Sequence, residues 1–152
     1  MAIERVAPDL IEAGRTLLEH LDEMGIEPQG ALWIHFYHLK DWRYTVVTDF
    51  VDVIGRRKTY ALISKALSQF DPIDGLSLVD VHLSAPSEVL PKVLGGIFHI
   101  DGDGTGVASV KECTINDMPV DAEIYRLRPA REMALAQRAA RKTLRKLEKL
   151  PA

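Results

Sequence analysis

The strictest alternation of apolar and polar positions lies between residues 31 and 51, and it predicts a β-hairpin with its turn at 39–41. A period of two residues is that of a strand with one face toward a core. Leu32, Ile34 and Phe36 alternate with Trp33, His35 and Tyr37 in the first arm, and Trp42, Tyr44, Val46 and Phe50 alternate with Arg43, Thr45 and Asp49 in the second. Both tryptophans lie here, so we expect the remaining elements to cover this hairpin.

Apolar patterns elsewhere in the chain predict further helices and strands. Spacings of three and four residues predict helices at 7–24, 56–70, 86–94 and 129–150, and β-rich runs predict strands at 76–83, 97–100, 107–115 and 120–127. A right-handed crossover through 56–70 would place 76–83 parallel to the second hairpin arm. The expected fold is therefore α+β, with a mixed, mainly antiparallel sheet built on the N-terminal aromatic hairpin and flanked by N-terminal, middle and C-terminal helices.

Length and composition predict one domain. The chain has 152 residues, of which 47% are hydrophobic, and this suits a single α+β domain over 1–152 with 129–150 as a peripheral basic helix. Its one cysteine, Cys113, excludes an internal disulfide and is expected to be a packed thiol. The start lacks a signal-peptide pattern and no long apolar run occurs, so we expect a cytoplasmic protein with no transmembrane segment.

Short motifs along this framework give a family resemblance. They are Ala31-Leu32-Trp33, Asp41-Trp42-Arg43, a helix that begins after Gly55, and Ile124-Tyr125-Arg126-Leu127. Together with the amphipathic N-terminal helix, they resemble a group of small bacterial proteins that carry no assigned activity. The resemblance spans nearly the whole chain up to Leu127. It implies a common fold and a bacterial cytoplasm, and it carries over no functional residue.

The charge of the chain is divided unevenly between its body and its C-terminal end. The overall net charge is −3, yet residues 126–152 hold nine Lys and Arg against two Glu, which gives +7. The first 125 residues hold ten basic and twenty acidic groups, which gives −10. A basic segment beside an acidic body indicates either attraction within the molecule or a surface for an acidic partner.

The predicted C-terminal helix is the first candidate site. Its proposed partner-binding residues are Arg138, Arg141, Lys142, Leu144, Arg145, Lys146, Leu147 and Lys149. A helix that docks its apolar stripe on the acidic body is one interpretation, and a dimerisation helix with that stripe exposed is another. Nucleic-acid binding is a further alternative, although the helix has no aromatic residue to stack on bases. Membrane binding is less favoured because the apolar face is small and rich in alanine.

A calcium-loop pattern is the second candidate. Asp101, Asp103, Thr105 and Glu112 stand at positions one, three, five and twelve of an EF-hand loop, with glycine at position six. The context favours a turn instead, because Gly95-Gly96 interrupts the preceding helix and 110–115 has the β-branched character of a strand. We therefore expect no cofactor, and calcium binding at this loop is the alternative.

A polar cluster on the sheet is the third candidate. Asp80 and His82 are expected on one face of the strand at 76–83, with His35 and Asp49 on the neighbouring hairpin arms. Converging histidines and carboxylates can hold a metal or transfer protons. Buried or solvated side chains without a shared role are the alternative interpretation.

No established catalytic motif occurs in the sequence, which lowers the expectation of enzyme activity without excluding it. The leading hypothesis is a non-enzymatic module that binds another protein or a second copy of itself through the basic C-terminal helix. A cation-binding or metal-dependent module is the alternative, and nucleic-acid binding by the basic segment is the third option.

Overall fold

The structure, a computed structural model, describes residues 6–39, 41–102 and 106–150. In that part of the chain the helices are α1 (Pro8–Glu23), α2 (Phe50–Ile54), α3 (Arg56–Leu67), α4 (Val89–Ile97) and α5 (Met133–Glu148), and the strands are β1 (Gly30–Phe36), β2 (Arg43–Val47), β3 (Val81–Ser84), β4 (Ala108–Ile115) and β5 (Met118–Leu127). A short 3-10 turn, η1 (Leu78–Asp80), precedes β3.

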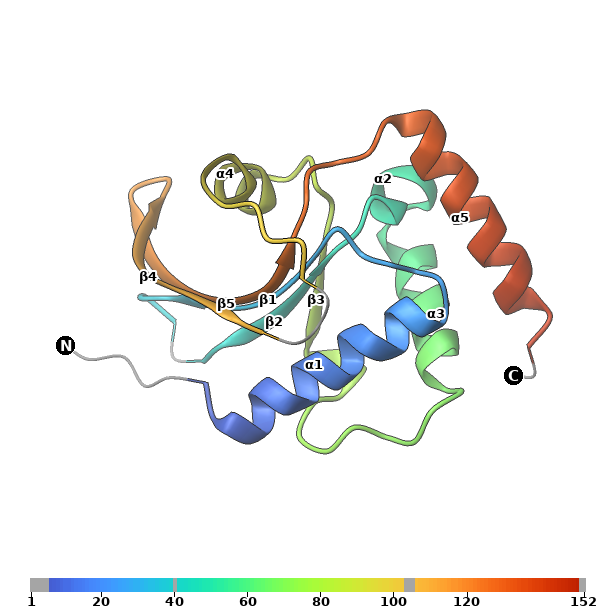
Figure 1. Ribbon diagram of the computed structural model, residues 1–152, viewed down its shortest axis with the longest axis horizontal. Coiled ribbons are helices and arrows are strands. Elements are labelled where there is room, and N and C mark those ends of the chain that lie inside the picture. Colours follow the sequence, from blue (N-terminus) through green and yellow to red (C-terminus); the bar gives the residue numbers. More distant parts are fainter. Residues whose placement is uncertain (1–5, 40, 103–105, 151–152) are drawn as a thin grey trace.

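The strands form one mixed sheet in the order β3-β2-β1-β5-β4 (Figure 1). β1 pairs antiparallel with β2 and with β5, and β5 pairs antiparallel with β4. β2 and β3 are parallel, as a crossover through α3 requires. The predicted α+β class, the hairpin at the centre of the sheet and the parallel third strand are all confirmed.

Two apolar clusters lie on opposite faces of the sheet. One joins α1 and α3 to a sheet face that contains Trp33, Tyr44 and Tyr125. The other joins α4 to the opposite face, which contains Leu32 and Ile34. Figure 1 shows α4 on one side of the sheet and α1 on the other. Successive β1 residues therefore point into different clusters, and β1 is buried on both faces.

The second hairpin arm is shorter than its apolar pattern predicted. β2 ends at Val47, and Phe50 and Val51 lie in α2 instead of continuing the strand. The Thr48 hydroxyl accepts a hydrogen bond from the Phe50 N–H at 3.2 Å, and Asp49 has helical backbone angles, so the chain turns before Phe50. Phe50 is fully buried all the same.

Two further predicted strand segments adopt other conformations. Residues 78–80 form η1, and this turn leaves the Val79 side chain 83% exposed although the alternation placed it toward the core. α4 extends to Ile97, and Ile100 forms only an isolated bridge with Leu127. In both places the apolar pattern predicted a strand, but a local turn or helix forms instead and breaks the period of two.

Candidate functional site

Helix α5 is docked on the body of the protein through small side chains. Ala136, Ala140 and Thr143 are buried in this contact, and the Thr143 hydroxyl donates to the Gly25 carbonyl oxygen at 3.2 Å. Leu147 is 1% exposed and Leu144 is half-buried against the same core. Both leucines were assigned to a partner contact from the sequence, and the structure corrects this because they pack against the protein's own core.

The opposite face of α5 carries the remaining predicted contact residues as one cationic stripe. They are all exposed: Arg138, Arg141, Lys142, Arg145, Lys146 and Lys149. At 1.5 Å of rise per residue the stripe is about 16 Å long. No side chain of the stripe makes an ion pair or hydrogen bond with another described residue. The Leu135 side chain, 47% exposed, lies one turn before Arg138 on the same line.

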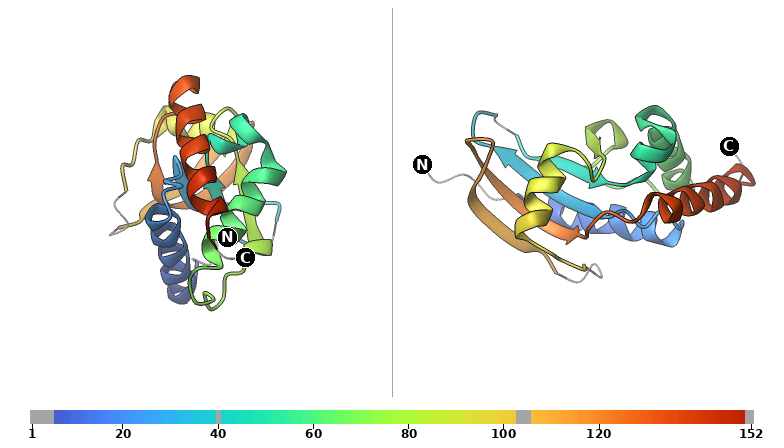
Figure 2. Two further views of the ribbon diagram at one scale, coloured as in Figure 1. Left: turned by 90° about the vertical axis from the view of Figure 1, so that its right-hand side faces the viewer. Right: turned by 90° about the horizontal axis from the view of Figure 1, so that it is seen from above.

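A partly buried ion pair fixes the segment that leads into α5. Arg131 donates from Nε to Asp49 Oδ2 at 2.7 Å and from Nη2 to Asp49 Oδ1 at 2.8 Å. These hydrogen bonds raise the pKa of Arg131 further above its ordinary value. Asp49 is buried and its backbone N–H donates to Gln29 Oε1 at 2.7 Å. The pair therefore ties the start of α5 to the body of the protein, and Figure 2 (left) shows the helix on the outside of the molecule beside α2 and α3.

The structure does not bring the four predicted sheet residues together. Asp49 is bound to Arg131. His35 lies opposite Asp121 in β5, with its ring centroid 5.5 Å from that of Trp42. Thr45 pairs with both Leu32 and His82, so His82 lies on the sheet face of Leu32 and opposite to that of His35.

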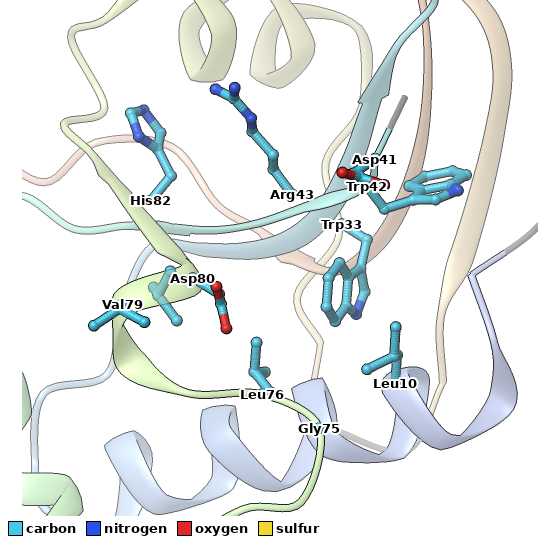
Figure 3. Close-up of a pocket in the computed structure, with 11 residues that line it drawn as sticks. Leu10, Trp33, Asp41, Trp42, Arg43, Gly75, Leu76, Val79, Asp80 and His82 are labelled. Carbon is cyan, nitrogen blue, oxygen red and sulfur yellow. The ribbon is translucent and has the colours of Figure 1, made fainter. Parts of the chain in front are cut away.

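A pocket of about 540 Å³ surrounds the ends of β2 and β3, and it contains two of those four residues (Figure 3). Asp80 points toward Leu76 on the side of α1, where Trp33 forms the wall. His82 and Arg43 point to the other side of the sheet. Asp80 and His82 were expected on one face, but Asp80 belongs to η1, where the alternation of a strand does not hold.

Burial has the largest effect on the pKa of His82. It lowers the pKa of the imidazole, and the nearby guanidinium groups of Arg56 and Arg43 lower it further, whereas Glu88 acts in the opposite direction. Burial would raise the pKa of Glu88, but hydrogen bonds from Ser84 and Arg56 outweigh it and hold that pKa below its ordinary value. His82 is therefore neutral and Glu88 is charged near pH 7.

The predicted calcium loop is only partly described. Asp103 and Thr105 lie outside the described residues. The Asp101 carboxylate is exposed beside His99 at 3.2 Å, and Glu112 lies within β4, where its φ of 54° marks an irregularity in the pairing with β5. The segment after the loop is thus a strand. No three His, Cys, Asp or Glu side chains among the described residues are grouped so that they could hold a metal ion. Calcium binding stays the untested alternative to a turn.

Sequence reasoning missed several residues that the structure places at the candidate sites. Arg131 was counted only as one more charge, and Thr45, Ser84 and Glu88 were not singled out. Ser84 and Glu88 are four residues apart and bond to each other, whereas Arg131 and Asp49 are 82 residues apart. A local spacing search could have found the first pair. Only the fold reveals the second.

Fold and surface together define this chain as an α+β protein with a mixed five-stranded sheet and a docked cationic helix. No family model, no curated protein and no solved structure matches it. Within the described ranges, no helix combines the length and the apolar character that a membrane crossing needs. The function is therefore argued from the sites themselves.

Proposed function

We propose that the protein is a binding module whose α5 stripe attaches to a protein partner with an acidic surface. The observation that carries the proposal is the set of six outward cations without a partner among the described residues, on a helix that is itself firmly docked. Because the helix is already docked, binding does not have to order its backbone. Such a surface attracts an acidic partner over a distance and fixes the position in which the partner binds.

The exposed Leu135 favours a protein over a polyanion without apolar groups. It continues the stripe at its N-terminal end, and the neighbouring Met133 is 51% exposed. A protein partner can cover these two apolar side chains, and their removal from water adds to the affinity of an interface. The stripe has no aromatic residue to stack on nucleic-acid bases. The apolar stripe of α5 is buried in the body and is not free for insertion into a membrane.

Charge reversal on the stripe tests the proposal. The probe is a short fluorescein-labelled amphipathic helix with Glu and Leu on one face, and its binding is followed by fluorescence anisotropy. We expect the double variant Arg141→Glu, Arg145→Glu to bind at least about tenfold more weakly. Leu135→Ser should also weaken binding. Added salt should weaken the wild-type complex because the pairs are exposed.

The matched control reverses two other exposed cations. Arg57→Glu, Lys58→Glu on α3 changes the net charge by the same amount at exposed positions outside the stripe. It should keep wild-type affinity. Equal loss in both double variants would reduce the effect to overall charge and would contradict the proposal. A DNA duplex or phosphatidylserine vesicles that bind in preference to the peptide would also contradict it.

A further inference from the structure

Helix α4 covers only part of one face of the sheet, and a cavity lies beside it on the same face. α4 packs over the part of this face that β1, β5 and β4 form. Beyond it, over β2 and β3, the structure has a second cavity, of about 330 Å³. One wall is apolar and consists of Ile34, Phe36 and Leu90. A cavity of about 300 Å³ or more with an apolar wall is large enough for a small organic ligand.

The other wall of this cavity is polar and is built by the register of the sheet. Arg43 stands opposite Ile34, and Thr45 stands between Leu32 and His82. Paired residues share a face of the sheet, so Arg43, Thr45 and His82 project into the same space. Figure 3 shows Arg43 and His82 pointing to this side of the sheet together.

Three of the polar groups in the cavity are free to bind a ligand. Thr45 is 1% exposed, yet its hydroxyl makes no hydrogen bond to any described residue. Arg43 and His82 likewise form no ion pair or side-chain hydrogen bond with the described part of the chain. A donor that is not already engaged can give its hydrogen bond to a ligand atom without breaking a bond inside the protein.

The one acid in the lining is already neutralised. Ser84 donates to Glu88 Oε2 at 2.5 Å, and Arg56 forms an ion pair with the same carboxylate. Arg56 also donates from Nε to the Leu83 carbonyl oxygen at 3.3 Å, which fixes its position. The charge left for a ligand to meet is therefore the guanidinium of Arg43.

We propose that this cavity binds a small carboxylate with an apolar body. The carboxylate accepts hydrogen bonds from the Arg43 guanidinium and the Thr45 hydroxyl, and the body lies against Phe36 and Leu90. Guanidinium and carboxylate match in geometry and charge. An amine would be repelled by Arg43, and the cavity has no unpaired acid to bind it. An inorganic anion would make no contact with the apolar wall. The site is on the α4 side of the sheet and does not involve α5.

Hexanoate is the probe, and hexylamine, hexanol and inorganic phosphate are its comparisons. Amide chemical shifts of the full chain in heteronuclear NMR spectra report binding and its location. We expect hexanoate to shift the signals of β2, β3 and the start of α4 with a saturable dependence on concentration. Absence of such shifts at millimolar hexanoate would overturn the proposal. Equal binding of hexanol, or of phosphate, would also overturn it, because then either the charge or the apolar body would be irrelevant.

Variants separate the roles of the two donors. Arg43→Gln should weaken hexanoate binding at least about tenfold, and Thr45→Val should weaken it about fivefold while keeping the side-chain shape. Thr45→Ser keeps a hydroxyl and should retain binding, which distinguishes the lost donor from a packing defect. Arg57→Gln, at an exposed position of α3, is the control and should bind as the wild type does. Unchanged affinity in both Arg43→Gln and Thr45→Val would refute the assigned contacts.

The histidine adds a dependence on pH. Arg43 from β2, Arg56 from α3 and Glu88 from the segment before α4 act on His82, whereas Asp80 points to the other side of the sheet (Figure 3). A bound carboxylate favours the protonated imidazole, and the pKa of His82 lies below its ordinary value of 6.5, so hexanoate affinity should rise as the pH falls through and below about 6.5. His82→Gln should remove this rise. Affinity that falls over the same interval in the wild type would contradict a carboxylate beside His82.

Discussion

Replacing Arg126 with methionine should lower the free energy of unfolding by about 3 kcal/mol. The Arg126 side chain is 4% exposed and donates to both oxygens of Asp22, at 2.8 and 2.7 Å. It also donates from Nε and Nη2 to the Gly102 carbonyl oxygen, at 3.0 Å each. Methionine fills much of the volume but leaves these acceptors without their donor. Because the Asp22 side chain is 31% exposed and can be rehydrated, we place the loss at the lower end for a broken buried ion pair.

Urea unfolding of the single variant and two comparison variants tests this. Arg128→Met is the matched control: Arg128 lies two residues further along, is exposed, and makes one hydrogen bond to the Asp101 carbonyl oxygen. It should cost about 1 kcal/mol or less. The double variant Arg126→Met, Asp22→Leu should recover part of the loss, since it removes the unpaired carboxylate. Equal losses for Arg126→Met and Arg128→Met would show that the buried network contributes little.

Arg126 also illustrates what the sequence alone could not reveal. Its partner Asp22 is 104 residues away and belongs to α1, where a charged residue on the polar side of an amphipathic helix indicates only a solvated surface. Arg126 itself lies in β5, within the short motif that suggested the resemblance. A charged residue in a strand does not reveal its partner from the sequence, because the contact between β5 and α1 exists only in the folded chain.

The parts of the fold that were predicted correctly depend on local periodicity. The alternation in each arm predicted the two strands of the hairpin, and the structure adds their register, in which Trp33 lies opposite Tyr44 with ring centroids 5.2 Å apart. Phe50 was assigned to a strand because it is apolar at an even spacing from Tyr44. It is equally buried in α2, so burial alone could not distinguish a strand from a short helix. The Thr48 hydroxyl bond to Phe50 is the local signal that could have done so.

The candidate sites divide in the same way. The cationic stripe of α5 follows from helical spacing and was predictable residue by residue. The sequence did not predict whether the apolar side of α5 is docked or free, because alanines at 136 and 140 suit both states. The cavity over β2 and β3 was missed because Thr45 and Arg43 are ordinary strand residues, and only the pairing of β2 with β3 places them beside His82.

The contact between α1 and the sheet depends on the absence of a side chain at Gly14. A Cβ there would lie 2.5 Å from the Tyr125 hydroxyl oxygen, 2.7 Å from Tyr44 Cε2 and 2.9 Å from Trp33 Nε1. These groups cannot easily move, because they also hold the helix. The Tyr44 hydroxyl donates to the Gly14 carbonyl oxygen at 2.8 Å, and Trp33 Nε1 donates to the Tyr125 hydroxyl at 3.0 Å.

Gly14→Ala should therefore destabilise the protein by about 1 to 3 kcal/mol, even though alanine is favoured over glycine in a helix by about 1 kcal/mol. Gly95→Ala in α4 is the matched control, because a Cβ there would meet no atom within 4 Å. It should stabilise the protein by up to about 1 kcal/mol through helix propensity alone. Thermal and urea unfolding of the two variants give the comparison. A stabilising Gly14→Ala would mean that α1 does not approach the aromatic groups of the sheet this closely, and the packing of the larger core described above would have to be abandoned.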